Sequence, residues 1–373
     1  MESYRLFIVV LPGMEDLALE ELELKCPLTE ITKLKGGLEL SADLAWIERA
    51  HTLLKIPTRI LMRVTEFKVR DFPKLYQKFL NFSWTPFLSH PHPQWEIVCH
   101  QSRLNHTGRM EETINKAMAE VLKRQPLSKD WEKKNYRPQT FYIRLQDDLL
   151  TLSLDLTGDP LHKRGLQTIK GEAPLRENFA AAMVYELTRD LKTETILVDP
   201  MCGSGTLLVE ALTFHRPLHL RTFDFETAPF YKGKLLKLSA QSTPLAISKA
   251  FGFDTNAELL SKIQVDLPIS LKVQNSLEEK IEIDGEMIMI CNPPYGERIK
   301  IDGKRGSFLK QAWEKFLTVD KPFRFAWVLP SDMDDLFSKA PGYKLISKRP
   351  FRNGGIAVTY WIWEKKSQER IIH

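Results

Sequence analysis

The sequence lacks the features that would place it in several common classes of protein. Its four cysteines are scattered and form no CxxC pair, which argues against a zinc site and against a disulfide framework. No apolar run approaches the roughly 18 residues that a membrane span requires, and the N-terminus has no signal-peptide pattern. The phosphate-binding patterns GxGxxG and GK[ST] are also missing. We therefore expect a cytoplasmic protein that uses no metal, has no membrane partner and does not bind nucleoside triphosphates.

A large excess of one charge is missing too. The 373 residues include 53 Lys and Arg against 48 Asp and Glu, which gives a net charge of +5. This mildly basic balance is compatible with nucleic acid as a partner without requiring it. Hydrophobic residues make up 43% of the chain, so large cores can form. The length suggests two or three domains, and we expect a monomer.

Residues 1–158 are predicted to form α+β structure without a recognisable catalytic cluster. In residues 1–55, a strand and a helix are followed by two short strands around Gly36 and Gly37 and by a second helix. This order is typical of a small unit of the split βαβ kind. Residues 56–158 continue with four strands and two helices.

Basic residues are the most distinctive feature of this half. The run from Val121 to Pro138 contains six Lys or Arg and two acidic residues, with Trp131 and Tyr136 between them. The run is typical of a patch that contacts nucleic-acid phosphates and also of a solvated loop, and both interpretations stay open. Further basic residues lie in the connector 159–175. The candidate nucleic-acid contacts are Lys123, Arg124, Lys133, Lys134, Arg137, Lys163, Arg164 and Arg298.

The pattern changes in residues 176–373. Helices and fully apolar strands alternate from here to the end of the chain. Such alternation predicts an α/β domain with a mostly parallel, doubly wound sheet, and places ligands at the carboxyl ends of the strands.

The stretch ILVDPMCGSGT predicts a cofactor site. A buried strand ends at Asp199, and Gly203 and Gly205 permit a tight turn that a ligand can approach closely. The acid would repel a phosphate but would accept hydrogen bonds or attract a cation. This favours an adenosyl cofactor with an amino group and a sulfonium over a dinucleotide. The candidate contacts are Asp199, Pro200, Cys202, Gly203, Ser204, Gly205 and Thr206.

A second acid is expected to bind the ribose hydroxyls of such a cofactor. Asp224 or Glu226 has the spacing of about 20 residues from the glycines that is typical of dinucleotide-binding folds, whereas Asp254 lies between a predicted strand and a predicted helix. Spacing alone leaves both positions open. After a third strand, Asn275 or Ser276 could hydrogen-bond the adenine edge, although this pair is equally typical of a turn.

The stretch MIMICNPPY predicts the reacting groups. A buried strand ends at Cys291, and Asn292, Pro293, Pro294 and Tyr295 follow. The prolines cannot continue a strand and make this loop rigid. The side-chain carbonyl of Asn292 and the backbone carbonyl of Pro293 can then accept both hydrogens of an exocyclic amine and aim its lone pair at a methyl group. Tyr295 offers an aromatic face on which an extruded base can stack.

Together, DPMCGSGT and NPPYGER resemble the class I, Rossmann-like, S-adenosylmethionine-dependent amino-group methyltransferases. The series PLHKRG, APLREN, DPMCGSGTLLVEA and RTFDFE is similar to the THUMP-domain RNA guanine-N2 methyltransferases of the bacterial large-subunit ribosomal RNA type, as are VLPGMEDLALEEL and SRLNHTGRMEETINKAM in the first half. The resemblance implies four regions. These are a ferredoxin-like unit (1–55), a THUMP RNA-binding domain (56–158), a linker (159–175) and a Rossmann-like methyltransferase domain (176–373).

The resemblance also implies roles for particular residues. The family carries an insertion with an R-x-F-x-F-E stretch, which Arg221–Glu226 match, so that Asp254 becomes the ribose-binding acid. The turn after Asp199 would line the methionine end of S-adenosylmethionine, and Asn292 would bind the target amine. This chain departs from the family at Asn275, where the family usually has an acid. Because larger members carry a second methyltransferase, an end at His373 implies one activity.

The expected reaction is therefore methylation of the exocyclic N2 amine of a guanine in RNA, with 23S ribosomal RNA as the first substrate to test. The Asn-Pro-Pro-Tyr geometry suits any planar exocyclic amine, so two alternatives stay open: adenine N6 in DNA or RNA, and guanine N2 in transfer RNA. A non-catalytic RNA-binding assembly protein is the alternative from another class.

Overall fold

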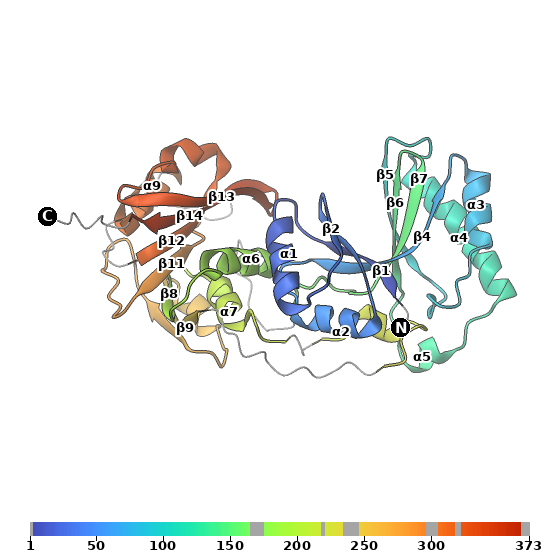
Figure 1. The fold of residues 1–373 in the computed structure, drawn as a ribbon, viewed down its shortest axis with the longest axis horizontal. Helices are drawn as coiled ribbons and strands as arrows, with labels where there is room; N and C mark the ends of the chain where they lie inside the picture. Colours follow the sequence, from blue (N-terminus) through green and yellow to red (C-terminus); the bar gives the residue numbers. More distant parts are fainter. Residues whose placement is uncertain are drawn as a thin grey trace. The chain divides into compact units, whose positions relative to one another are not determined.

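The computed structural model describes residues 3–164, 175–217, 221–233, 246–295, 305–317 and 322–366 (Figure 1). The described residues form two compact units. The first contains 3–11, 19–164 and 221–233, and the second contains 12–18, 175–217, 246–295, 305–317 and 322–366.

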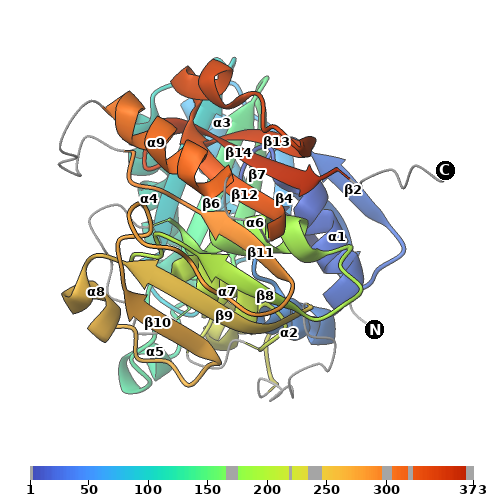
Figure 2. The same cartoon turned by 90° about the vertical axis from the view of Figure 1, so that its left-hand side faces the viewer.

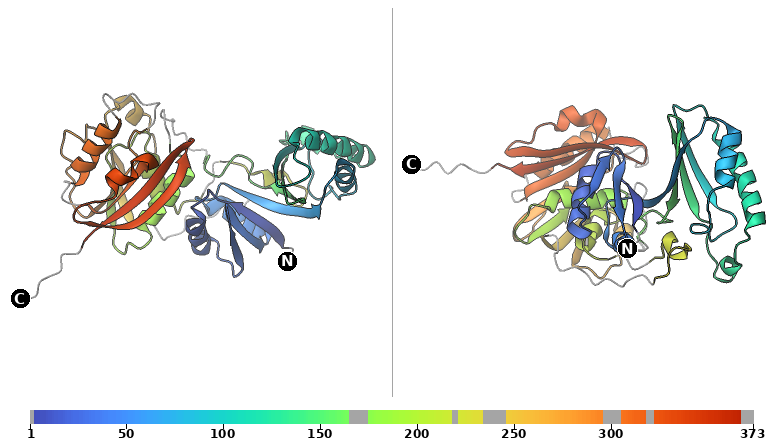
Figure 3. Two further views of the ribbon diagram at one scale, coloured as in Figure 1. Left: turned by 90° about the horizontal axis from the view of Figure 1, so that it is seen from above. Right: turned by 45° about the vertical axis from the view of Figure 1, so that its right-hand side comes forward.

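The first unit is built on one seven-stranded sheet with the order β2-β3-β1-β4-β7-β6-β5, in which only the pair of β5 and β6 is parallel. Its elements are β1 (Tyr4–Val9), most of α1 (Glu15–Lys25), β2 (Ile31–Leu34), β3 (Gly37–Ala42), α2 (Leu44–Leu53), β4 (Arg59–Lys68), α3 (Phe72–Leu80), β5 (Gln94–His100), α4 (Thr107–Arg124), α5 (Asp130–Lys133), β6 (Thr140–Gln146), β7 (Leu149–Asp155) and η1 (Asp224–Thr227). The long strand β4 pairs with β1 on one side and with β7 on the other (Figure 3). The α+β order predicted from the sequence is confirmed.

Local chemistry explains where these elements begin and turn. Asp43 and Asp71 cap α2 and α3, because each side chain accepts a hydrogen bond from the backbone N–H three residues later. Gly37 cannot be replaced without a clash, since a Cβ atom there would lie 2.3 Å from the carbonyl oxygen of Ile8. The hairpin between β6 and β7 turns through Asp147, which has a positive φ of 51°.

The second unit contains a seven-stranded sheet with the order β10-β9-β8-β11-β12-β14-β13 (Figure 2). Its elements are α6 (Glu177–Thr188), β8 (Thr195–Asp199), α7 (Thr206–Thr213), β9 (Ile247–Asp254), α8 (Ala257–Ser261), β10 (Ile269–Val273), β11 (Met287–Cys291), α9 (Arg305–Leu317), β12 (Pro322–Pro330), η2 (Ser331–Phe337), β13 (Tyr343–Asn353) and β14 (Ile356–Lys365). The first five strands in this order are parallel, which confirms the mostly parallel sheet. The alternation expected up to the end stops at β12, because β13 and β14 form an antiparallel hairpin.

The middle of this sheet is fully apolar. All five residues of β11 are buried, and the leucine and valine of β8 are 0% exposed, as in strands covered on both faces. Because β8, β9 and β11 are parallel neighbours, their carboxyl ends share one edge. In this register Asp199 lies opposite Gly252, and Val198 lies opposite Met289.

Residues 221–233 lie within the sequence range predicted for the methyltransferase domain, yet they pack on the first unit. The rings of Phe223 and Phe225 lie 4.9 and 4.8 Å from the ring of His51. The hydroxyl of Tyr231 donates a hydrogen bond of 2.6 Å to a glutamate of α2. The first unit is therefore completed by a segment that follows it by more than fifty residues.

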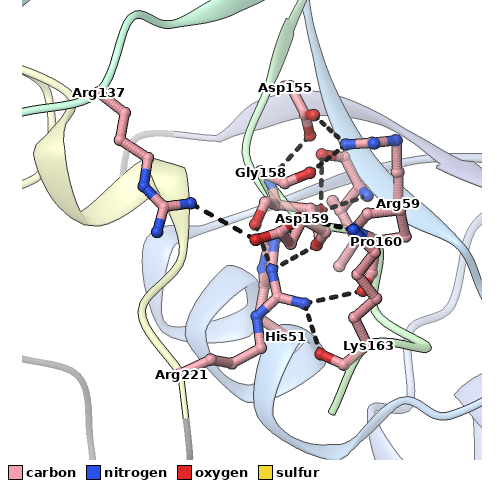
Figure 4. Close-up of polar contacts among 11 residues, drawn as sticks. His51, Arg59, Arg137, Asp155, Gly158, Asp159, Pro160, Lys163 and Arg221 are labelled. Carbon is pink, nitrogen blue, oxygen red and sulfur yellow. Dashed lines mark hydrogen bonds and ion pairs between the residues drawn. The ribbon is translucent and has the colours of Figure 1, made fainter. Parts of the chain in front are cut away.

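Arg221 ties this segment to the connector after β7 (Figure 4). Its terminal nitrogens donate to the backbone carbonyls of Thr157, Asp159, Pro160 and Lys163. One guanidinium thus donates to four carbonyl oxygens of a segment that is itself neither strand nor helix. We conclude that Arg221 fixes the path of the connector.

Replacing Arg221 by Leu should destabilise the first unit. The change leaves several carbonyl oxygens without a donor, and we expect a loss of about 3 kcal/mol in the free energy of unfolding. Urea unfolding measures it. Arg137→Leu is the matched control, because Arg137 has a side chain that is 73% exposed and makes an ion pair with Asp159, and its loss should cost about 0.5 kcal/mol or less. Equal losses in the two variants would contradict the assignment.

Candidate active site

The turn after β8 has the geometry predicted for a ligand-binding loop. Asp199 is 1% exposed, and its carboxylate accepts a hydrogen bond of 3.1 Å from the N–H of Met201. Gly203 and Gly205 have φ values of +52° and +73°, a region that favours glycine. The N–H of Cys202 donates to a carbonyl oxygen of β9 at 2.9 Å and so fixes the turn to the neighbouring strand. A Cβ atom at Gly203 would meet no heavy atom within 4 Å, so space is open beside the turn.

The two candidate positions for the second acid have different surroundings. The carboxylate of Asp254, at the end of β9, accepts a hydrogen bond of 2.9 Å from the N–H of Gly203, and a second from the N–H of Asn256. Asp254 therefore lies directly beside the glycine turn. Asp224 and Glu226 belong to the first unit, where Asp224 packs against a glycine of the connector and Glu226 accepts a hydrogen bond from the N–H of Phe223.

Burial controls the charge of Asp199, the acid at the end of β8. Loss of water around Asp199 raises the pKa of its carboxyl to about 8, and the negative charge of nearby Asp254 adds to this effect. Asp199 therefore holds a proton at neutral pH, unless a cation lies close enough to stabilise its carboxylate. The pair is arranged to favour a positively charged group at this edge.

The predicted adenine contacts separate into two roles. The carboxamide oxygen of Asn275 accepts a hydrogen bond of 3.1 Å from the N–H of Leu277, so this side chain performs turn chemistry. Ser276 is 3% exposed, and its hydroxyl has no hydrogen-bond partner among the described residues. Of the two alternatives, the geometry leaves the Ser276 hydroxyl as the group available to a ligand.

The end of β11 presents an acceptor without a donor. The side-chain oxygen of Asn292 is buried and has no hydrogen-bond partner within the described parts of the chain. Pro293 is buried and Pro294 is half-buried. Tyr295 is 5% exposed, and its hydroxyl accepts a hydrogen bond of 3.1 Å from the side-chain nitrogen of Asn353. The free aromatic face expected from the sequence is therefore covered.

The remaining predicted cofactor contacts lie in the same turn. Pro200 and Cys202 are buried, and the hydroxyls of Ser204 and Thr206 lie 3.3 Å apart. Burial raises the pKa of the Cys202 thiol, which makes it a packing group and not a nucleophile. The sequence thus predicted a set of residues that the parallel strands do bring to one edge. It missed Asn353, because the RNGG pattern indicates a turn but not the distant residue that the turn approaches.

The predicted RNA contacts have mixed surroundings. Lys123 and Arg124 are exposed and pair with Glu120. Lys133 and Lys134 are exposed at α5, and Arg137 and Lys163 pair with Asp159.

Arg164 corrects the prediction. It is 2% exposed, and its guanidinium donates to the backbone carbonyls of Leu161 and Lys55, so it does not face RNA. Arg298 lies outside the described residues. In the part of the chain that the structure describes, no group of three or more His, Cys, Asp or Glu side chains could hold a metal ion, and no helix is long and apolar enough to cross a membrane.

The strand order and the acid-and-glycine turn define an α/β domain of the class in which ligands bind at the carboxyl edge of a parallel sheet. Residues 164–359, just over half of the chain, match the family described as RMKL-like, methyltransferase domain. The chain belongs to this family of methyltransferases.

Two curated relatives show the extent of the similarity. The ribosomal RNA large subunit methyltransferase K/L of Photobacterium profundum is 30% identical over 310 residues, which cover 77% of this chain and 43% of the relative. The protein of the same name from Hahella chejuensis is 25% identical over 392 residues, which cover 98% of this chain and 53% of the relative. The chain thus spans about half the length of the curated relatives it matches.

Solved structures share the fold over almost the whole chain. A possible methylase from Clostridium difficile 630 has a TM-score of 0.77 at 24% identity, covering 99% of this chain and 100% of its own. SMU.472, solved in complex with SAH, has a TM-score of 0.80 at 21% identity, and the likeness covers 99% of this chain and 100% of SMU.472. TrmN from Thermus thermophilus has a TM-score of 0.70 at 18% identity, and the likeness covers 98% of this chain and 100% of TrmN. These likenesses establish the fold: an N-terminal α+β region and a C-terminal methyltransferase domain.

The raised pKa of Asp199 predicts a pH dependence of stability. Between about pH 4 and pH 8 the folded chain keeps a proton on Asp199 that the unfolded chain releases, so the free energy of unfolding falls as the pH rises. The isosteric change Asp199→Asn removes this contribution, which is at most about 1.4 kcal/mol per pH unit. Urea unfolding at pH 5 and pH 8 should show that the variant gains stability relative to the wild type at the higher pH. Parallel pH profiles would contradict the buried, protonated state.

Proposed function

We propose that this chain binds S-adenosylmethionine and transfers its methyl group to the exocyclic N2 amine of a guanine in RNA, with 23S ribosomal RNA as the substrate. The observation that carries the proposal is the buried, unpartnered side-chain oxygen of Asn292 among the described residues, at the same sheet edge as Asp199 and Asp254. A buried acceptor without a donor costs roughly 1–3 kcal/mol. An amine that enters the site would supply that donor.

The donor set at this edge fits the proposed cofactor. Two carboxylates, at Asp199 and Asp254, suit an amino group and ribose hydroxyls, and the hydroxyl of Ser276 suits a polar edge of adenine. The open space beside Gly203 admits a ligand next to the backbone. A protein of the same fold, SMU.472, was solved in complex with SAH. When bound, S-adenosylmethionine supplies an electrophilic methyl group on a sulfonium.

The protein's part in the reaction is to position the amine and polarise it. The oxygens of Asn292 and Pro293 accept the two N–H hydrogens, which draws the nitrogen towards tetrahedral geometry and exposes its lone pair. A nitrogen–carbon bond then forms as the sulfur–carbon bond breaks, and one proton leaves for water. No strong base is required, because the proton is acidic once the nitrogen is alkylated. Catalysis thus consists of orientation and preformed dipoles.

RNA as the proposed substrate is supported by the other half of the chain and by the names of its relatives. We propose that residues 1–55 and 56–158 form a ferredoxin-like unit and a THUMP domain that hold RNA by its shape and phosphates. The exposed cations at Lys123, Arg124, Lys133 and Lys134 support this role. Curated relatives that match most of the chain are named ribosomal RNA large subunit methyltransferases.

Three variants separate cofactor binding from chemistry. Asn292→Ala should lower the rate of methyl transfer to RNA by roughly 100- to 1,000-fold, with the dissociation constant for S-adenosylmethionine unchanged, because Asn292 acts on the amine. Asp254→Ala should abolish saturable cofactor binding. Asp224→Ala is the matched control, because its carboxylate belongs to the first unit, and it should bind the cofactor as the wild type does.

Equilibrium dialysis and single-turnover transfer from labelled S-adenosylmethionine measure the two effects. Full transfer by Asn292→Ala would remove the proposed mechanism. Loss of cofactor binding in Asp224→Ala but not in Asp254→Ala would reverse the assignment of the ribose-binding acid.

A further inference from the structure

The tip of the β13–β14 hairpin brings a buried polar side chain to the candidate active site. Gly354 and Gly355 form the turn with φ values of +58° and +91°, and Asn353 pairs with Ile356 at its base. Side chains alternate along the end of β13: Phe351 and Asn353 are buried, whereas the residue between them is exposed. Asn353 thus continues the inward-facing row of the strand.

Phe351 anchors this row. Its ring lies 4.4 Å from the ring of Phe179 in α6, so the inward face of the hairpin is held two residues before Asn353. The positive φ values fall on the two glycines, and an asparagine is not needed at position 353 to make the turn. An apolar residue would continue the buried row equally well. The choice of asparagine therefore needs another explanation.

The hydrogen bond that Asn353 makes explains why an asparagine stands at this position. Its side-chain nitrogen donates to the hydroxyl oxygen of Tyr295 at 3.1 Å, and both residues are buried, at 9% and 5% exposure. A buried amide is tolerated where it is hydrogen-bonded. Tyr295 stands three residues after Asn292 on a loop that two prolines make rigid. A bond that fixes the phenol at one end of this loop therefore also constrains the carboxamide at the other.

We infer that Asn353 is a positioning residue that holds Tyr295, and through it the loop of Asn292, in the orientation that receives the target base. This inference rests on the proposed function and adds the β13–β14 hairpin to the strand ends that form the site. Asn353 acts through the tyrosine and touches neither the amine nor the cofactor. Its removal should slow methyl transfer and leave cofactor affinity intact, because the residues proposed to hold the cofactor lie at β8, β9 and β10.

A double-mutant cycle tests the inference. Asn353→Leu, Tyr295→Phe and the double variant are compared with the wild type in single-turnover methyl transfer to RNA, and the dissociation constant for S-adenosylmethionine is measured for each. Tyr295→Phe removes one oxygen atom and leaves the hairpin intact, so it reports on the same bond even where Asn353→Leu folds poorly. Lys344→Ala is the matched control, at the far end of the same hairpin, where the side chain is 55% exposed.

We expect each single variant to slow transfer by roughly 10- to 100-fold, the double variant to be no slower than the slower single variant, and the control to retain the wild-type rate. Wild-type rates in both single variants, or effects that multiply in the double variant, would overturn the role of Asn353. Failure of the proposed function looks different: the wild type would bind the cofactor but transfer no methyl group, and would then equal Asn292→Ala. That result overturns both proposals.

Discussion

The parallel pairing of β8 with β9 and β11 is the constraint on which the candidate site depends. It brings the ends of three strands that are far apart in the sequence to one edge, where Asp199, Asp254 and Asn292 follow them. A hydrogen bond from Gly203 to Asp254 then joins the turn after β8 to the end of β9. The five residues of β11 and the leucine and valine of β8 are apolar and buried, so the polar groups of the site follow these strands at their carboxyl ends. The apolar residues that form the core of the sheet are thus separate from the polar residues of the candidate site.

Unsatisfied polar groups are the clearest sign of function in this edge. Buried polar atoms normally have hydrogen-bond partners. The side-chain oxygen of Asn292 and the hydroxyl of Ser276 have none among the described residues, and both residues follow strands whose carboxyl ends lie at this edge. The protonated state of Asp199 points the same way, since its carboxylate would be stabilised by a cation. The proposed cofactor and target amine supply the groups that these three residues lack. The site is therefore organised before any ligand arrives, as electrostatic preorganisation requires.

Periodicity and strand-end motifs predicted the α+β order of the first unit, the parallel strands of the second and the polar residues that follow them, because these depend on local pattern. They did not predict the antiparallel hairpin of β13 and β14. Local patterns could not predict which segments far apart in the sequence pack together. Spacing could not choose between Asp224 and Asp254. The packing of Phe223 and Phe225 on His51 shows that Asp224 belongs to the first unit and not to the unit that contains the site. Arg164 reads as one more surface cation, but backbone carbonyls bury it. Asn353 reads as part of a turn, and its contact with Tyr295 depends on how β13 and β11 lie in the sheet.

The identity of the methylated nucleoside tests the central claim most directly. The chain would be incubated with labelled S-adenosylmethionine and total RNA that lacks the modification, and the RNA would be digested to nucleosides and separated. The account predicts label in N2-methylguanosine from 23S ribosomal RNA. Label in N6-methyladenosine, or in transfer RNA alone, would contradict the proposed substrate, and an absence of label with the cofactor still bound would contradict the proposed activity.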